Sequence, residues 1–224
     1  MSALITAWTM DVRDVTPHAP PDDIVARAGA ELLARWDEPA RRYHTTRHLV
    51  EMFGALEELE VARVINARQC SLARLAAWFH DAIYDPGAMP GSNEEDSAAL
   101  ARDILLQLGF GDRDIVAIDR LILATAEHGT HHADGTIDAE PLDAAFHDAD
   151  LWILSAPTDR FDNYCAQVRE EYADVPDPAY RHRRTAVLES LAHRDTVYRT
   201  SRALDRWEMP ARINLGRELA RLRA

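Results

Sequence analysis

The sequence predicts an all-α protein that forms one domain. Only 9 glycines occur among 224 residues, and runs of the β-branched residues typical of strands are few. Apolar residues instead recur at the three- and four-residue intervals of a helix face. A chain of this length can build a complete core by itself. We therefore expect about eight to nine helices in residues 22–224, after an irregular lead-in over residues 1–21.

The first three expected helices are bounded by caps and prolines. The first begins at the aspartates of positions 22 and 23, which suit a helix N-cap, and ends before Pro39. A threonine near position 46 caps the second, which runs to Leu59. The third runs from about Ser71 to Tyr84 with apolar residues at helical spacing, and a loop that opens at Asp85 follows it.

Proline, glycine and capping residues predict the bounds of the other helices. Ser92-Asn93-Glu94-Glu95 predicts a capping box at the start of a fourth helix, which ends at Gly109. A fifth is expected from residue 112 or 114 to about 128, and prolines open the sixth at 141 and the seventh at 157. An eighth ends near residue 193. Residues 207–222 form a last amphipathic helix, which would pack on the same domain or on the second subunit of a homodimer.

Composition excludes several classes of function. A net charge of −13 disfavours a nucleic acid as the main partner, because binding to its backbone depends on clustered positive charge. All 25 basic residues are arginine, so chemistry that needs a catalytic lysine is excluded. Cys70 and Cys165 have no metal-binding or redox spacing. We expect no signal peptide and no membrane span, and therefore a cytoplasmic protein without a membrane partner.

An adjacent histidine and aspartate, His80-Asp81, stand at the end of the apolar third helix. A buried carboxylate needs a partner, and a metal ion bound by the imidazole nitrogen and the carboxylate oxygen is one such partner. The pair alone is weak evidence, because residues 147–148 repeat it. His48 and Asp150, each on another expected helix, complete a set of two imidazoles and two carboxylates. This set suits an ion of Mn, Fe, Mg, Ni or Zn.

Other titratable residues are candidates for catalysis. Asp85 and Glu94 flank the loop beside the His-Asp pair and are predicted to act as general acid or base, with helix capping as the alternative. His128 is predicted to bind a phosphate or protonate a leaving group. His44 lies one helical turn before His48, and we expect a structural or substrate role for it.

Guanidinium and amide groups are the candidates for substrate binding. A guanidinium group grips phosphate through two parallel hydrogen bonds. An amide side chain can cap a helix and still face a substrate. The predicted substrate-binding residues are Arg47, Asn93, Arg169 and Arg184. For any single arginine among 25, a solvated surface role is the alternative.

Several segments share their pattern with a known family. The segments are Tyr43–His48, Trp78–Pro86, Asn93–Ala98 and Asp148–Leu151, with shorter matches at Arg169–Tyr172, Arg184 and Ala211–Leu215. Together, over about residues 40–220, they resemble the HD superfamily of metal-dependent phosphohydrolases, in particular a bacterial branch of predicted phosphohydrolases. The resemblance implies an all-α HD-domain fold and one divalent metal ion, or sometimes two. In the second case His128, with a histidine at 131 or 132, would hold the second ion. The ligands that it implies here are His48, His80, Asp81 and Asp150.

The sequence therefore predicts a metal-dependent hydrolase of phosphoric esters or anhydrides. A metal-bound water would attack a nucleotide-like or small phosphorylated substrate. Three alternatives stay open: an HD-fold non-haem di-iron oxygenase, a non-catalytic metal- or ligand-binding module, and a structural ion that holds three helices together.

Overall fold

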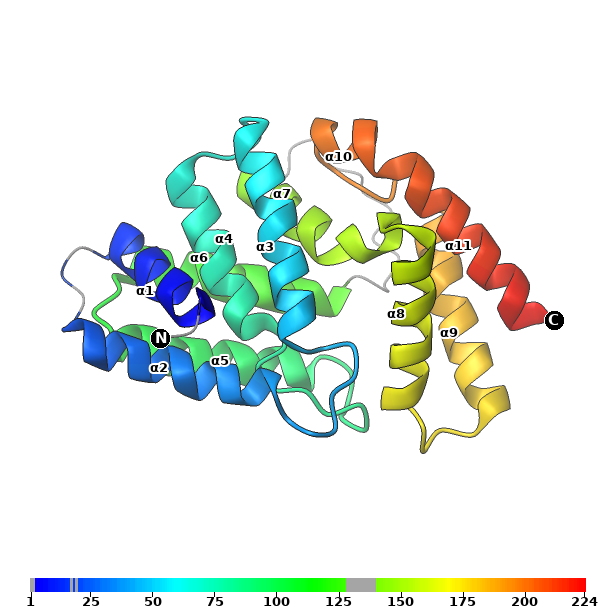
Figure 1. The fold of residues 1–224 in the computed structure, drawn as a ribbon, viewed down its shortest axis with the longest axis horizontal. Helices are drawn as coiled ribbons and strands as arrows, with labels where there is room; N and C mark the ends of the chain where they lie inside the picture. The colour runs from blue at the N-terminus through cyan, green and yellow to red at the C-terminus, as the bar shows by residue number, and fades with distance from the viewer. Residues whose placement is uncertain (1–2, 17, 19, 128–139) are drawn as a thin grey trace.

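The computed structural model describes residues 3–16, 18, 20–127 and 140–224. Within these residues the protein is all-helical, as the sequence predicts (Figure 1). The helices are α1 (Ala3–Val15), α2 (Asp22–Trp36), α3 (Thr46–Val61), α4 (Ala67–His80), α5 (Ser92–Gln107), α6 (Asp112–Ala124), α7 (Pro141–Asp150), α8 (Thr158–Glu171), α9 (Asp177–Ala192), α10 (Ser201–Arg206) and α11 (Glu208–Arg223). Two short 3-10 helices, η1 (Thr125–Glu127) and η2 (Leu151–Ser155), continue α6 and α7.

The prediction of an irregular lead-in over residues 1–21 is wrong, because residues 3–15 form helix α1. Trp8 anchors this helix: its side chain is fully buried, and its indole N–H donates to the Val25 carbonyl at 2.8 Å. The Trp8 ring also packs edge-on against Trp78 of α4, with centroids 5.6 Å apart. A β-carbon at Gly29 would lie 2.5 Å from Trp8, so the glycine is what lets α1 approach α2. Prolines begin only after the helix ends and so gave no reason to exclude it.

Two helix starts also differ from the sequence prediction. Helix α4 begins at Ala67, earlier than expected, because Asn66 and Gln69 form a capping box before it. Conversely, the capping box predicted at Ser92 does not form, and Gly91 precedes α5 with φ 85°. The Asn93 side chain instead bonds the backbone N–H and carbonyl of Asp85, at 3.1 and 3.0 Å. This pairing fixes the loop between α4 and α5.

Helix α4 is the central element of the fold. It contacts α1, α3, α5, α6 and α7, and ten of its 14 residues are buried, so its last residue lies inside the protein. In Figure 1, α1, α2 and α5 lie toward one end of the molecule, and α8, α9 and α11 lie toward the other. The ends of α3, α4 and α7 meet between these two groups of helices.

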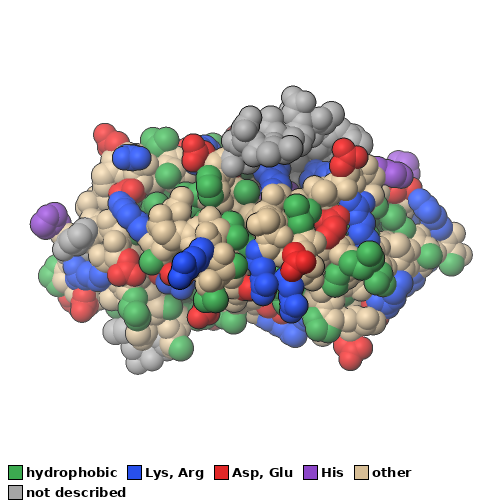
Figure 2. Space-filling model, turned by 90° about the horizontal axis from the view of Figure 1, so that it is seen from above, with side chains coloured by type: hydrophobic (Ala, Val, Ile, Leu, Met, Phe, Trp, Pro, Cys, Tyr) green, Lys and Arg blue, Asp and Glu red, His purple; other side chains and the backbone are tan. Residues whose placement is uncertain are grey.

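The surface carries both signs of charge. On the face shown in Figure 2, acidic, basic and hydrophobic side chains are interspersed. Arginine is the only basic residue type, and many of its side chains pair with neighbouring carboxylates, as Arg217 does with Asp162 at 2.8 Å. In the part of the chain that the structure describes, no helix is long and apolar enough to cross a membrane.

Candidate metal centre

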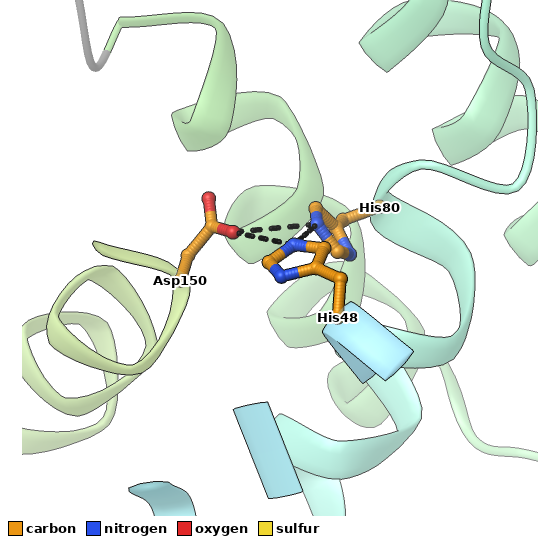
Figure 3. A group of neighbouring side chains, drawn as sticks. All are labelled: His48, His80 and Asp150. Atoms are coloured by element: carbon orange, nitrogen blue, oxygen red, sulfur yellow. Dashed lines mark hydrogen bonds and ion pairs between the residues drawn. The ribbon is translucent and has the colours of Figure 1, made fainter. Parts of the chain in front are cut away.

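Three helices bring one potential metal ligand each to a single point (Figure 3). His48 lies in the first turn of α3, His80 is the last residue of α4, and Asp150 is the last residue of α7. The start of α3 is fixed by Thr45, whose hydroxyl accepts a hydrogen bond from the backbone N–H of Arg47 at 3.4 Å. Helix ends suit the assembly of a metal site, because a side chain in a terminal turn can extend past the end of its helix.

The three donor atoms form a nearly regular triangle. The Nε2 atoms of His48 and His80 are 3.3 Å apart, and the Asp150 Oδ1 lies 3.1 Å from the first and 3.4 Å from the second. Metal–ligand bonds of about 2.0 to 2.2 Å at tetrahedral or octahedral angles separate adjacent donor atoms by about 2.8 to 3.6 Å. The triad of His48, His80 and Asp150 therefore has the donor types and the spacing that a divalent ion requires.

Hydrogen bonds on the far side of each imidazole orient both rings. His80 Nδ1 donates to the Ala77 carbonyl at 2.9 Å, which leaves Nε2 as the nitrogen with a lone pair in the neutral ring. His48 Nδ1 is hydrogen-bonded to the Tyr43 hydroxyl at 3.1 Å. Trp36 packs against the His80 ring, with centroids 5.6 Å apart. Such outer contacts are typical of metal-ligating histidines.

Asp81, the other predicted ligand, lies beside the triad. Its Oδ2 is 2.9 Å from His80 Nε2 and 3.9 Å from His48 Nε2. The two consecutive residues face the same centre because α4 stops at His80 and Asp81 leaves the helical conformation, with φ −116° and ψ 19°. Arg41 holds this helix end by donating to the carbonyls of Asp81 and Ala82, at 2.7 and 3.1 Å.

Burial and neighbouring charges shift the pKa values of the two imidazoles in opposite directions. Burial lowers the pKa of His48, which favours the neutral form that binds metals. Burial also opposes the charged form of His80, but the carboxylates of Asp81 and Asp150 outweigh it and raise its pKa well above the ordinary value. For Asp81, burial is outweighed by His80 and His44, so its pKa is lowered. A divalent cation bound at His80 Nε2 would replace that proton as the charge that compensates the carboxylates.

His44 is held next to the triad by a buried carboxylate. Its Nδ1 is 2.7 Å from Glu171 Oε2, its Nε2 is 3.9 Å from Asp81 Oδ2, and its ring stacks on Tyr84 with centroids 4.0 Å apart. Glu171, at the end of α8, also accepts the backbone N–H groups of residues 42–44 at 2.7 to 3.0 Å. Despite burial, these donors and His44 lower the pKa of Glu171 to about 2. Glu171 thus fixes the segment before α3.

A pocket of about 610 Å³ opens beside the triad. All four predicted ligands line it. Asp85, Asn93, Glu94 and Arg184 line it as well. Its other walls are aromatic and aliphatic side chains of the α8–α9 end, including Tyr164, Tyr180 and Leu188. The volume lies in the range of small-molecule sites.

Two predicted substrate-binding arginines do not line the pocket. Arg47 points to solvent, with 55% of its side chain exposed, and pairs with Glu51 at 3.1 Å. Arg169 closes the end of α8, because its guanidinium donates to the carbonyls of Tyr172 and Val175 at 2.6 and 3.1 Å. Both therefore have local roles in the structure. His128, with the histidines at 131 and 132, lies outside the described residues.

Sequence reasoning missed the residues that orient the site. Tyr43, Arg41 and Glu171 hold the ligands or the segments that carry them, as described above. Glu171 is one of three consecutive charged residues at 169–171. Which of their side chains is buried depends on how α8 is rotated about its own axis. A pattern of residue types carries no such signal.

Comparisons with models of protein families, with curated proteins and with solved structures found no match. The resemblance to the HD superfamily therefore stays a prediction from the sequence segments.

Proposed function

We propose that the protein is a metal-dependent hydrolase that cleaves a phosphoric ester or anhydride of a small, nucleotide-like or phosphorylated compound. The observation that carries the proposal is the triangle of two imidazole nitrogens and one carboxylate oxygen, with sides of 3.1, 3.3 and 3.4 Å, at the wall of a pocket. An ion that only joins helices would have a closed shell of protein ligands. Because this triad lies beside a pocket, an ion held by it would keep coordination positions open for water and substrate.

The donor set supports a hard or borderline divalent cation, such as Mn, Fe, Mg, Ni or Zn. Such an ion lowers the pKa of water and polarises a phosphoryl oxygen. His48, His80 and Asp150 would hold it, and Asp81 completes the set from beside His80.

The residues around the triad would position and protonate the substrate. His44 Nε2, which faces Asp81 at 3.9 Å, is placed to exchange a proton at the pocket wall, and Glu171 fixes the ring. Asp85 and Glu94, the general acid or base predicted from the sequence, line the same pocket from the loop and the start of α5. The apolar walls exclude water from the body of a bound substrate.

The test is a hydrolysis screen on protein of defined metal content. Protein treated with chelator and reloaded with each of Mn²⁺, Fe²⁺, Ni²⁺, Zn²⁺ and Mg²⁺ would be assayed with p-nitrophenyl phosphate, its bis ester and nucleoside mono-, di- and triphosphates. We expect product release that requires one of the ions and is lost in Asp150→Ala. If the loaded wild type releases no more product than Asp150→Ala on every compound, the proposal is wrong. The metal could then still bind, as it would in a non-catalytic module.

A further inference from the structure

Arg184 on α9 has a guanidinium group that pairs with no carboxylate in the part of the chain that the structure describes. Arginine stays charged at all physiological pH, and a charge removed from water is costly unless it is paired. Among the described residues Arg184 forms no ion pair, and its one hydrogen bond donates from Nη2 to the Tyr164 hydroxyl at 2.6 Å. Its Nε is buried and has no hydrogen-bond partner in the described part of the chain. This arginine lines the pocket, and no described residue supplies its counter-charge.

Tyr180, one turn earlier on the same face of α9, repeats this feature. The residue is 5% exposed and lines the pocket. Its hydroxyl is also buried without a hydrogen-bond partner among the described residues. Arg169 stacks on the ring, with its guanidinium carbon 4.6 Å from the centroid, and adds a second positive charge nearby. Two unsatisfied donors on one helix face are rare in native proteins and point to a missing acceptor.

Two tyrosine rings separate Arg184 from the triad. The guanidinium lies over the Tyr164 ring, 5.0 Å from its centroid, and Tyr164 packs edge-on against Tyr43 at 4.5 Å. Tyr43 in turn is bonded to His48. The guanidinium and the triad therefore belong to one pocket and are separate positions in it.

We propose that Arg184, with Tyr180, is a second anchoring point of the pocket and binds an acidic group of the ligand. This deepens the proposed function, because it assigns the substrate class: a compound with one phosphoryl group at the triad and a second oxyanion, carboxylate or phosphate, at α9. The apolar wall formed by Val168, Leu188 and Leu191 covers the body between the two groups. A guanidinium that binds an oxyanion gains the charged partner that the described residues do not supply.

The test measures anion binding without metal, so that it does not depend on hydrolysis. Chelator-treated protein would be titrated calorimetrically with phenylphosphonate and with benzoate. We expect wild type to bind at least one probe at millimolar concentration, and the stronger probe identifies the preferred acid. Arg184→Met should weaken binding at least about tenfold, while Arg184→Lys, which keeps the charge, should retain more of it. Asp150→Ala should not weaken it.

Two further variants separate binding from folding. Arg181→Met removes the same charge from α9 outside the pocket, where Arg181 pairs with Asp177, and should leave the affinity within about twofold. Tyr180→Phe removes no hydrogen bond to the described residues, so it should weaken binding without lowering the thermal midpoint. The inference is overturned if Arg184→Met binds as wild type does, or if wild type binds neither probe. A loss of metal-dependent hydrolysis alone would overturn only the proposed function.

Discussion

The chain contains two His-Asp pairs, and they have opposite surroundings. His80-Asp81 lies at the end of α4, and its side chains meet His48 and Asp150 beside the pocket. His147-Asp148 lies inside α7, and both of its side chains are buried. Asp148 accepts the backbone N–H groups of Arg199 and Thr200, both at 2.8 Å, and is 3.0 Å from His147 Nδ1. The first pair faces other potential metal ligands. The second pair holds the backbone of residues 199–200 through hydrogen bonds to Asp148.

The difference lies in what other helices bring to each pair. Two backbone N–H groups satisfy the carboxylate of Asp148, although burial still raises its pKa to about 6. Among the described residues, no backbone N–H group donates to the side chains of His80 and Asp81 in this way. Their partners are further side chains of the ligand type, carried by α3 and α7. A His-Asp dipeptide therefore becomes a candidate metal site through its partners, and the dipeptide alone does not decide.

The largest effect is expected from Asp150→Ala. The variant removes one corner of the triad, and we expect metal affinity to fall by more than about 100-fold, since residues that only orient a ligand already contribute about 10- to 100-fold. Equilibrium dialysis against Mn²⁺ or Zn²⁺ with elemental analysis measures this. Asp148→Asn, two residues away in the second pair, is the matched control and should keep the wild-type stoichiometry. Equal metal binding by Asp150→Ala and wild type would refute the site.

For stability, the larger effect is expected from a change at Asp148 and the smaller one from a change at Asp150. Asp148→Ala leaves the buried N–H group of Thr200 and the partly buried N–H group of Arg199 without their acceptor, and should lower the free energy of unfolding by about 3 kcal/mol. Urea denaturation of the metal-free protein measures this loss. Asp150→Ala, whose carboxylate is 13% exposed, should lose much less. If Asp148→Ala is as stable as wild type, the hydrogen bonds of Asp148 to the backbone of residues 199–200 do not stabilise the fold.

A smaller effect, dependent on pH, is expected from Glu171→Gln. The pKa of Glu171 is about 2 in the folded protein and 4.5 ordinarily, so its carboxylate stabilises the fold fully above pH 4.5 and loses this effect as the pH falls toward 2. We expect Glu171→Gln to lower the free energy of unfolding by about 2 kcal/mol at neutral pH. The difference from wild type should shrink below pH 4.5 in urea titrations. Glu170→Gln, at an exposed position, is the control, and a difference independent of pH would contradict the assignment.

The sequence predicted the helical class and three candidate ligands that the structure brings together, and it predicted less well the residues that hold them in place. Ligand types such as His48 and Asp150 are recognisable because few residue types bind metals, and the helix ends that carry them are marked by caps and prolines. Helix α1 was missed because the prolines that follow it suggested an irregular segment over residues 1–21, although they begin only after the helix ends. Glu171 was missed because its contacts are with residues 42–44, more than 120 positions away. Contacts that distant depend on tertiary packing, which local patterns do not report.

The smallest effect is expected where a residue neighbours a ligand in sequence and not in space. Arg47 precedes His48 and was predicted to bind substrate, yet 55% of its side chain is exposed and its partner is Glu51. Glu51 keeps a second partner, Arg160, which donates to both of its oxygens at 2.6 and 2.7 Å. Arg47→Ala should therefore change stability by less than about 0.5 kcal/mol and the affinity for metal by less than about twofold. Dialysis tests the metal affinity, and urea titration tests the stability. A larger loss of metal affinity would show that Arg47 supports His48 although its side chain points to solvent.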